Sequence, residues 1–223
     1  MKLNNLFRYS FAIIGALIVT VAVVQAETRA TDEKAADTPA KNSASDKVEK
    51  KKDKSAKPDA DGWVPMFNGK DLTGWKVTEF GGEGEVSVEK GNVVITQGVD
   101  LSGITSTRKD LPKNNYEIEF EAQRAVGSDF FIGFTFPVED SSCSLICGGW
   151  GGGVCGLSSL DGMDAVENET TSYSSFKNGE WHKVRLRVTD DRIDAWLDKH
   201  QIVEVETADR KIDVRFEVDA SKP

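Results

Sequence analysis

Most of the chain after Trp63 alternates between apolar and polar residues at every second position. Residues 116–121 place Tyr116, Ile118 and Phe120 on one side of an extended chain and three glutamates on the other. The same alternation recurs over residues 181–188, 192–198 and 212–219. A period of two residues is typical of antiparallel sheets that have one face in the core and one in water. The pattern therefore predicts a strand in each of these four segments.

Two further segments refine the expected architecture. Residues 129–137 carry four phenylalanines and little charge on either face, which predicts a central strand covered on both sides. Residues 86–96 are interrupted by Lys90-Gly91-Asn92, a turn signal that predicts a hairpin. About ten such strands with no helical periodicity and no fixed repeat predict an all-β fold, a two-sheet antiparallel jelly-roll sandwich.

The first 60 residues have a different texture. Basic residues precede an apolar run of about 14 residues and a small-residue site at Val24-Gln25-Ala26, so residues 1–26 are expected to be a signal peptide rather than a spanning helix. Residues 27–60 contain no aromatic side chain and many charges, which predicts a disordered charged linker. We therefore expect a secreted or periplasmic protein whose folded domain spans residues 61–223 and keeps no stable membrane span after signal cleavage.

The charge balance restricts the function. The whole chain of 223 residues has a formal net charge of −9, whereas residues 61–223 carry 17 basic and 29 acidic side chains, a net charge of −12. Such an acidic domain repels phosphate backbones, so nucleic-acid binding is excluded as its main task.

The start of the domain carries a family signature. Residues 63–75 read Trp-Val-Pro-Met-Phe-Asn-Gly-Lys-Asp-Leu-Thr-Gly-Trp, and residues 115–121, 179–184 and 193–197 add three weaker similarities. Together they resemble the 3-keto-disaccharide hydrolase domain family over most of residues 63–220. The resemblance implies a concanavalin A-like jelly roll. It also implies cleavage of 3-keto-glycosides, in which a base removes the C2 proton and the glycosidic substituent is eliminated, often with the help of a divalent metal.

The chain departs from the family pattern in two places. Residues 143–156 form a segment rich in cysteine and glycine where active members carry polar groups, and Pro223 stands near where the family continues into a last strand. Either the domain is closed differently from the family pattern or it is truncated at its C-terminus. The expected function is an exported hydrolase or lyase acting on a glycoside, and the alternative is a noncatalytic carbohydrate-binding or adhesion module of the same fold. The cofactor is left open, with a divalent metal as the candidate.

The charged strand faces supply candidate site residues. Glu119 and Glu121 place carboxylates at every second position, which suits a catalytic acid and base, although cross-strand ion pairs on a solvated face explain the same pattern. Trp196 is an aromatic residue on a charged face, where sugar rings stack. The substrate-binding residues are therefore expected to be Trp196, Trp150, Arg185, Arg187 and Asp194. A tryptophan that merely covers the sheet is the alternative for Trp196.

The remaining candidates are structural. Three cysteines in an exported protein predict one disulfide and one spare thiol, and we assign the disulfide to Cys147 and Cys155. Alternation places His182 with core residues, so a buried structural histidine is expected. The acidic loop 161–169 lacks the order of a calcium loop, and no metal ligands are assigned.

Overall fold

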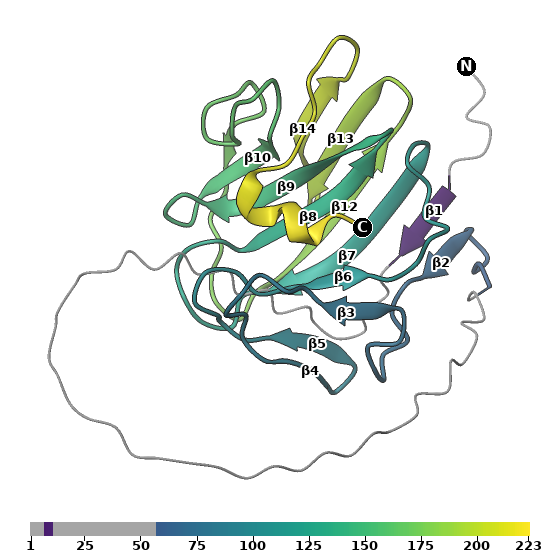
Figure 1. Ribbon diagram of the computed structural model, residues 1–223, viewed down its shortest axis with the longest axis vertical. Coiled ribbons are helices and arrows are strands. Elements are labelled where there is room, and N and C mark those ends of the chain that lie inside the picture. The colour runs from purple at the N-terminus through teal and green to yellow at the C-terminus, as the bar shows by residue number, and fades with distance from the viewer. Residues whose placement is uncertain (1–6, 11–56) are drawn as a thin grey trace, which may run out of the picture.

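The computed structural model describes residues 7–10 and 57–223. The expected signal peptide and linker lie almost wholly outside these residues. The described part consists of mainly antiparallel sheets, as predicted, and one short helix that was not predicted (Figure 1). None of the helices in the described ranges is long and apolar enough to cross a membrane.

Two main sheets form the sandwich. The six-stranded sheet has the order β14 (His200–Glu206), β13 (Arg192–Leu197), β12 (Trp181–Val188), β7 (Tyr116–Gln123), β1 (Phe7–Ser10) and β2 (Trp63–Pro65). The four-stranded sheet has the order β11 (Ser172–Tyr173), β10 (Val154–Ser158), β9 (Ser141–Gly149) and β8 (Ile132–Val138). Two smaller antiparallel pairs accompany them. One joins β3 (Trp75–Val77) with β6 (Ile104–Ser106), and the other is the predicted hairpin of β4 (Val86–Glu89) and β5 (Asn92–Ile95).

The core lies between the two main sheets. Val184, Leu186 and Val188 point inward from β12 and are fully buried, as are Cys143, Leu145 and Cys147 of β9. The opposite face of the six-stranded sheet is charged, and Lys183, Arg185 and Arg187 lie directly across from Glu121, Glu119 and Glu117. The alternation therefore predicted both the strands and the pairing of opposite charges between them.

One strand enters the sheet from the expected signal peptide. β1 lies between β7 and β2 and runs parallel to both, with Tyr9 opposite Val64 on one side and Ile118 on the other.

Two sequence predictions are wrong. β8 is not a central strand but the edge strand of the four-stranded sheet. Residues 212–219, predicted as a strand, form only an isolated bridge at Ile212, and the 3₁₀-helix η1 (Phe216–Ser221) follows. Alternation yields a strand only where a neighbouring edge offers hydrogen bonds. Here Ser159 pairs with Asp213, and Arg215 then binds Asp164 instead of continuing the ladder.

Both errors share a physical cause. η1 crosses the outer face of the four-stranded sheet, where Ser221 Oγ donates a hydrogen bond to Thr135 Oγ1 of β8 at 2.8 Å (Figure 1). The low charge on both faces of β8 is therefore explained by this cover and by a cavity beside the strand, rather than by a central position in a sheet.

Candidate functional site

A cavity of about 1170 Å³ passes around the free edge of β8. Its lining includes Ile132, Phe134 and Phe136 from the inner face of this strand and Gly133 and Thr135 from the outer face. Because successive residues of a strand point to opposite faces, the cavity has one compartment on each side of the four-stranded sheet. We call them the inner and the outer compartment.

The inner compartment lies between β5, β7 and β8 and is apolar. Its wall is formed by Met66, Phe67, Val93, Ile95, Ile118 and Phe120. The rings of Phe120 and Phe134 pack with their centroids 5.1 Å apart. Tyr116 also lies on the wall, but its hydroxyl already donates to the Pro137 carbonyl at 2.7 Å. Burial raises the pKa of Tyr116 well above its ordinary value, so this phenol stays protonated.

The outer compartment contains a row of hydroxyl groups. Thr135, Ser144 and Ser158 lie directly opposite one another on β8, β9 and β10. Thr135 and Ser144 share a hydrogen bond of 2.9 Å, and Ser158 donates to Asp164 Oδ1 at 3.0 Å. Hydroxyls donate and accept, so the row suits a ligand that carries hydroxyl groups of its own.

Trp150 and Arg215 close the outer compartment. The Arg215 guanidinium lies 5.8 Å from the centre of the Trp150 ring and binds Asp164 at 2.6 Å and Glu217 at 3.0 Å. The hydrogen bond to Glu217 raises the pKa of Arg215 further, which keeps it charged. An aromatic ring beside hydroxyl and guanidinium groups is an arrangement that binds sugars.

Asp129 is a carboxylate with one anchored oxygen. Its Oδ1 accepts hydrogen bonds from the backbone N–H groups of Phe130 at 2.8 Å and Gly151 at 3.0 Å. Its Oδ2 makes no hydrogen bond within the described part of the chain. These contacts fix the carboxylate beside Trp150 on the cavity lining.

A buried arginine supports the Asp129 segment. The side chain of Arg124 donates to the Phe176 carbonyl at 2.6 Å and to Asn178 Oδ1 at 2.7 Å, and more weakly to the Asp129 carbonyl at 3.5 Å. The 124–129 turn is therefore held against residues 176–178 independently of any ligand.

The family signature builds another part of the wall. Asn68 Oδ1 accepts the backbone N–H groups of Lys70 and Asp71, and Asp71 Oδ1 accepts that of Thr73. The resulting turn brings Trp75 back over Met66, whose carbonyl accepts from the indole nitrogen at 2.8 Å. The signature thus shapes the cavity wall, since Trp75 lines it.

Most of the predicted site residues lie elsewhere. Glu119, Glu121, Arg185, Arg187, Asp194 and Trp196 occupy the charged face of the six-stranded sheet, whereas the residues of β7 that reach the cavity come from its opposite face. Of the predicted binding residues, Trp150 is the one that lines the cavity.

On the charged face the predicted neighbours do meet. Lys183 forms an ion pair with Glu119 at 2.8 Å. The Arg185 guanidinium lies 4.0 Å from the centre of the Trp196 ring, so a sugar stacking on that side of the ring would have to displace it. The charged side chains of this face therefore interact with one another across neighbouring strands, which agrees with the alternative explanation of cross-strand ion pairs.

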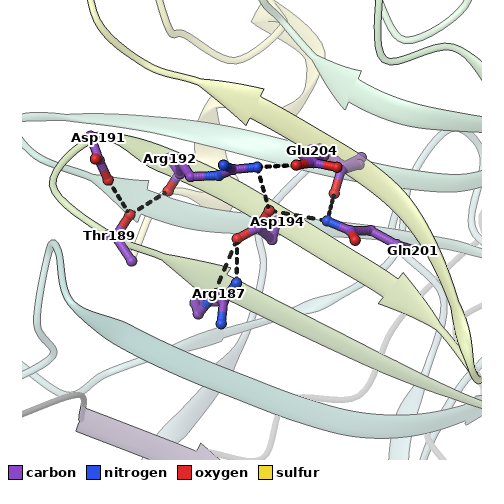
Figure 2. A network of polar contacts seen from close by, with 8 residues as sticks. Arg187, Thr189, Asp191, Arg192, Asp194, Gln201 and Glu204 are labelled. Atoms are coloured by element: carbon purple, nitrogen blue, oxygen red, sulfur yellow. Dashed lines mark hydrogen bonds and ion pairs between the residues drawn. The ribbon is translucent and has the colours of Figure 1, made fainter. Parts of the chain in front are cut away.

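Asp194 is the centre of a saturated network (Figure 2). Its side chain is 2% exposed and accepts from Arg187 at 2.7 Å and from Gln201 at 3.1 Å, with Arg192 at 3.5 Å. Arg192 in turn pairs with Glu204. Both carboxylate oxygens of Asp194 are occupied by protein groups, which indicates a structural role.

Cys147 and Cys155 are hydrogen-bonded neighbours on β9 and β10, and both are free thiols in the structure. The hydrogen bond to Cys155 and burial raise the pKa of Cys147, whereas the bond from Cys147 lowers the pKa of Cys155 to about 7. Cys143 is separate, and burial raises its pKa to about 12. The arrangement favours Cys155 as the attacking thiolate and Cys143 as the inert thiol.

We expect the predicted disulfide to form during oxidative folding. Refolding the reduced chain with oxidised and reduced glutathione should remove two hydrogens and leave one alkylatable cysteine under denaturing conditions. Peptide mapping by mass spectrometry should place the bridge between Cys147 and Cys155. A bridge to Cys143, or three reactive thiols after refolding, would contradict the assignment.

The acidic loop and His182, which were considered for metal binding and acid–base chemistry, have partners within the protein. Arg210 forms ion pairs with Asp161 and Glu169, so two carboxylates of the acidic loop already bind a protein cation. His182 Nδ1 lies 2.9 Å from Asp198 Oδ2, and its ring packs edge-on against two phenylalanines, as expected of a structural histidine. No three metal-ligating side chains converge within the described ranges. The residues do not fit a protein cage for a divalent metal, and no step proposed below uses one.

Sequence reasoning missed the hydroxyl row, Asp129 and Arg215. The alternation of β8 and β9 could have identified Thr135 and Ser144, because their neighbours in the chain are apolar residues that point to the opposite face of the sheet. Asp129 and Arg215 fell within the predicted strands 129–137 and 212–219, but in the structure both stand outside regular strands, so the alternation did not identify them as site residues.

Comparison with known proteins adds one finding. No curated protein and no solved structure matches the chain. The family model of the 3-keto-alpha-glucoside-1,2-lyase-like domain matches residues 62–216, more than half of the chain. The match spans the described strands that line the cavity, but it includes only Phe216 of η1. The resemblance carried by the signature is thereby confirmed, and the chain belongs to the 3-keto-alpha-glucoside-1,2-lyase-like domain family.

Proposed function

We propose that the domain cleaves 3-keto-glycosides, with the sugar bound in the outer compartment and Asp129 as the general base. The observation that carries this proposal is the Asp129 carboxylate, which has one anchored oxygen and lies beside Trp150 on the cavity lining. The family assignment supports a carbohydrate ligand. The predicted leader supports action outside the cytoplasm, in the periplasm or the medium.

The chemistry needs few protein groups. A keto group at C3 acidifies the proton on C2, and Asp129 accepts this proton as the C2–H bond breaks. The electron pair forms a C1=C2 double bond and the C1–O bond breaks. The oxygen of the aglycone takes up the proton that Asp129 accepted from C2, and the aglycone leaves as an alcohol. Charge that develops on the C3 oxygen is stabilised by hydrogen-bond donors, which Arg215 and the hydroxyl row supply.

The carboxylates of the charged face have other roles under this proposal. Glu119 is paired with Lys183, and β7 turns Glu119 and Glu121 away from the cavity. We therefore assign them to the stability of the six-stranded sheet.

Replacement of Asp129 with asparagine should lower the turnover of a 3-keto-glycoside by at least about 100-fold, because a positioned general base contributes about 10²–10⁴-fold. The amide oxygen still accepts the hydrogen bonds of Phe130 and Gly151, so binding should be preserved. Release of aglycone measures turnover, and calorimetry measures binding.

The matched control is Asp140→Asn, an exposed carboxylate whose partner is Lys113. This variant should keep the turnover of the unmodified chain. Equal turnover by the Asp129 and Asp140 variants would refute the role of Asp129.

A noncatalytic glycan-binding function is the second candidate. It is favoured by the absence of an imidazole from the described cavity lining, since His182 and His200 both lie elsewhere. Saturable sugar binding by the full chain without release of aglycone, with and without added divalent metal, would establish this function in place of cleavage.

A further inference from the structure

The cavity is larger than one sugar ring requires. Its volume of about 1170 Å³ exceeds the upper end, about 1000 Å³, of ordinary small-ligand pockets. The hydroxyl row, Trp150 and Arg215 all belong to the outer compartment. A sugar held there leaves the inner compartment, reached around the edge of β8, for the rest of the ligand.

The inner compartment offers little to a second sugar. Its walls are apolar side chains of β5, β7 and β8, and the Tyr116 hydroxyl is committed to the Pro137 carbonyl. On the side of β6, the hydroxyls of Thr78 and Thr105 bond each other at 2.8 Å. The hydroxyls of Ser102 and Ser106 on the same side accept backbone N–H groups of Gly84 and Arg108. The carboxylates of this side, Glu79 and Asp100, are exposed to solvent and lie apart from the apolar walls of β5, β7 and β8. A sugar ring here would bury hydroxyls without partners, which is unfavourable.

A flat apolar group, unlike a sugar ring, is expected to bind favourably in the inner compartment. It leaves no unpaired hydroxyl, and its burial against apolar walls is favourable. Phe134 lies at the junction of the compartments and packs with Phe120 on one side and with Phe136 at 5.9 Å on the other. These rings provide the offset and edge-on contacts that aromatic groups prefer.

We propose that the inner compartment binds the aglycone and selects glycosides with a flat, apolar aglycone, such as a phenyl group, over disaccharides. The inference rests on the proposed function, because it requires the sugar to lie in the outer compartment. It goes beyond that function by naming the leaving group that the chain prefers.

The test compares three ligands with the same sugar. The 3-keto forms of phenyl α-glucoside, methyl α-glucoside and maltose are titrated into the Asp129→Asn full chain by calorimetry, so that no ligand is consumed. Phenyl 3-keto-glucoside should bind at least 10-fold more tightly than either of the others. Equal affinity for the phenyl and methyl compounds, or tighter binding of the maltose derivative, would overturn the inference.

Two further substitutions, each made in the Asp129→Asn chain, test whether the phenyl group binds in the inner compartment. Phe134→Ala removes a half-buried ring at the junction, and Val93→Phe fills the inner compartment from β5. Each should abolish the phenyl preference and leave the affinity for the methyl compound within about twofold. Circular dichroism confirms folding, and the second variant keeps the test decisive if the first unfolds. A phenyl preference that survives both substitutions would place the aglycone elsewhere.

The results separate the two proposals. Methyl 3-keto-glucoside that binds, without a phenyl preference, overturns the aglycone inference alone. Failure of all three ligands to bind overturns the proposed function and the inference with it. As a control, Trp150→Ala should weaken all three ligands by a similar factor, because the tryptophan contacts the shared sugar.

Discussion

Replacement of Asp194 with alanine should lower the free energy of unfolding by about 2–3 kcal/mol. This is less than the loss of about 3–5 kcal/mol when a fully buried ion pair is broken, because the partner arginines are 32% and 36% exposed. The Asp194 side chain is 2% exposed and balances Arg187 and Arg192 on the outer face of the six-stranded sheet. The alanine variant leaves both guanidinium groups without this carboxylate. Urea unfolding monitored by fluorescence measures the change.

The control for this prediction is Asp191→Ala. Asp191 is exposed and accepts a hydrogen bond from Thr189 at the end of the same network (Figure 2). Its replacement should change the stability by no more than about 0.5 kcal/mol. If the two variants lost similar stability, Asp194 would not be the centre of the network, and a ligand-binding role for it would regain support.

Replacement of Gly148 with alanine should cost about 2–5 kcal/mol. The residue has φ +69°, a conformation that costs other residues about 1–2 kcal/mol. An added Cβ would lie 2.8 Å from Phe131 Cβ and 3.0 Å from the Phe176 ring, and overpacking adds about 1–3 kcal/mol. The same loop carries Trp150, so we also expect weaker binding of ligands in the outer compartment.

Gly162→Ala separates the two contributions. Gly162 has φ +80°, and a Cβ there would meet nothing within 4 Å. This variant should lose only the conformational part, about 1–2 kcal/mol. Thermal unfolding of both variants measures the difference, and equal losses would show that the loop tolerates the extra atom at Gly148.

Much of the fold could be predicted because it follows from a short-range pattern. The alternation in residues 116–121 and 181–188 predicts which side chains enter the core, and it allowed cross-strand ion pairs as the alternative explanation of the glutamates. The structure supplies the register, with Arg185 opposite Glu119. A charge ladder of this kind requires only neighbouring strands in register.

The two failures arose where tertiary contacts decide the outcome. Residues 212–219 have the alternation of a strand, but their pairing stops after Asp213 exchanges backbone hydrogen bonds with Ser159. Arg215 and Glu217 then pair with each other, and the chain turns into η1. β8 lacks charge on its outer face because η1 covers it, and a single sequence shows that a face is covered without showing what covers it.

The site was harder to predict than the fold for a related reason. Periodicity identifies the face to which Trp196 or Thr135 belongs, but it does not reveal which face is hollow. The cavity exists because η1, the Trp150 loop and the turn that ends at Trp75 meet around the edge of β8. Trp150 was predictable from its glycine-rich loop, whereas Asp129 acquires its role only through the backbone N–H groups of Phe130 and Gly151.

The central claim is that a glycoside binds around the edge of β8. A crystal structure of the Asp129→Asn full chain with phenyl 3-keto-glucoside tests it most directly. We predict electron density for the sugar between Trp150 and the hydroxyl row, with the phenyl group beside Phe134. Density over Trp196 on the charged face of the six-stranded sheet, with an empty cavity, would contradict the account.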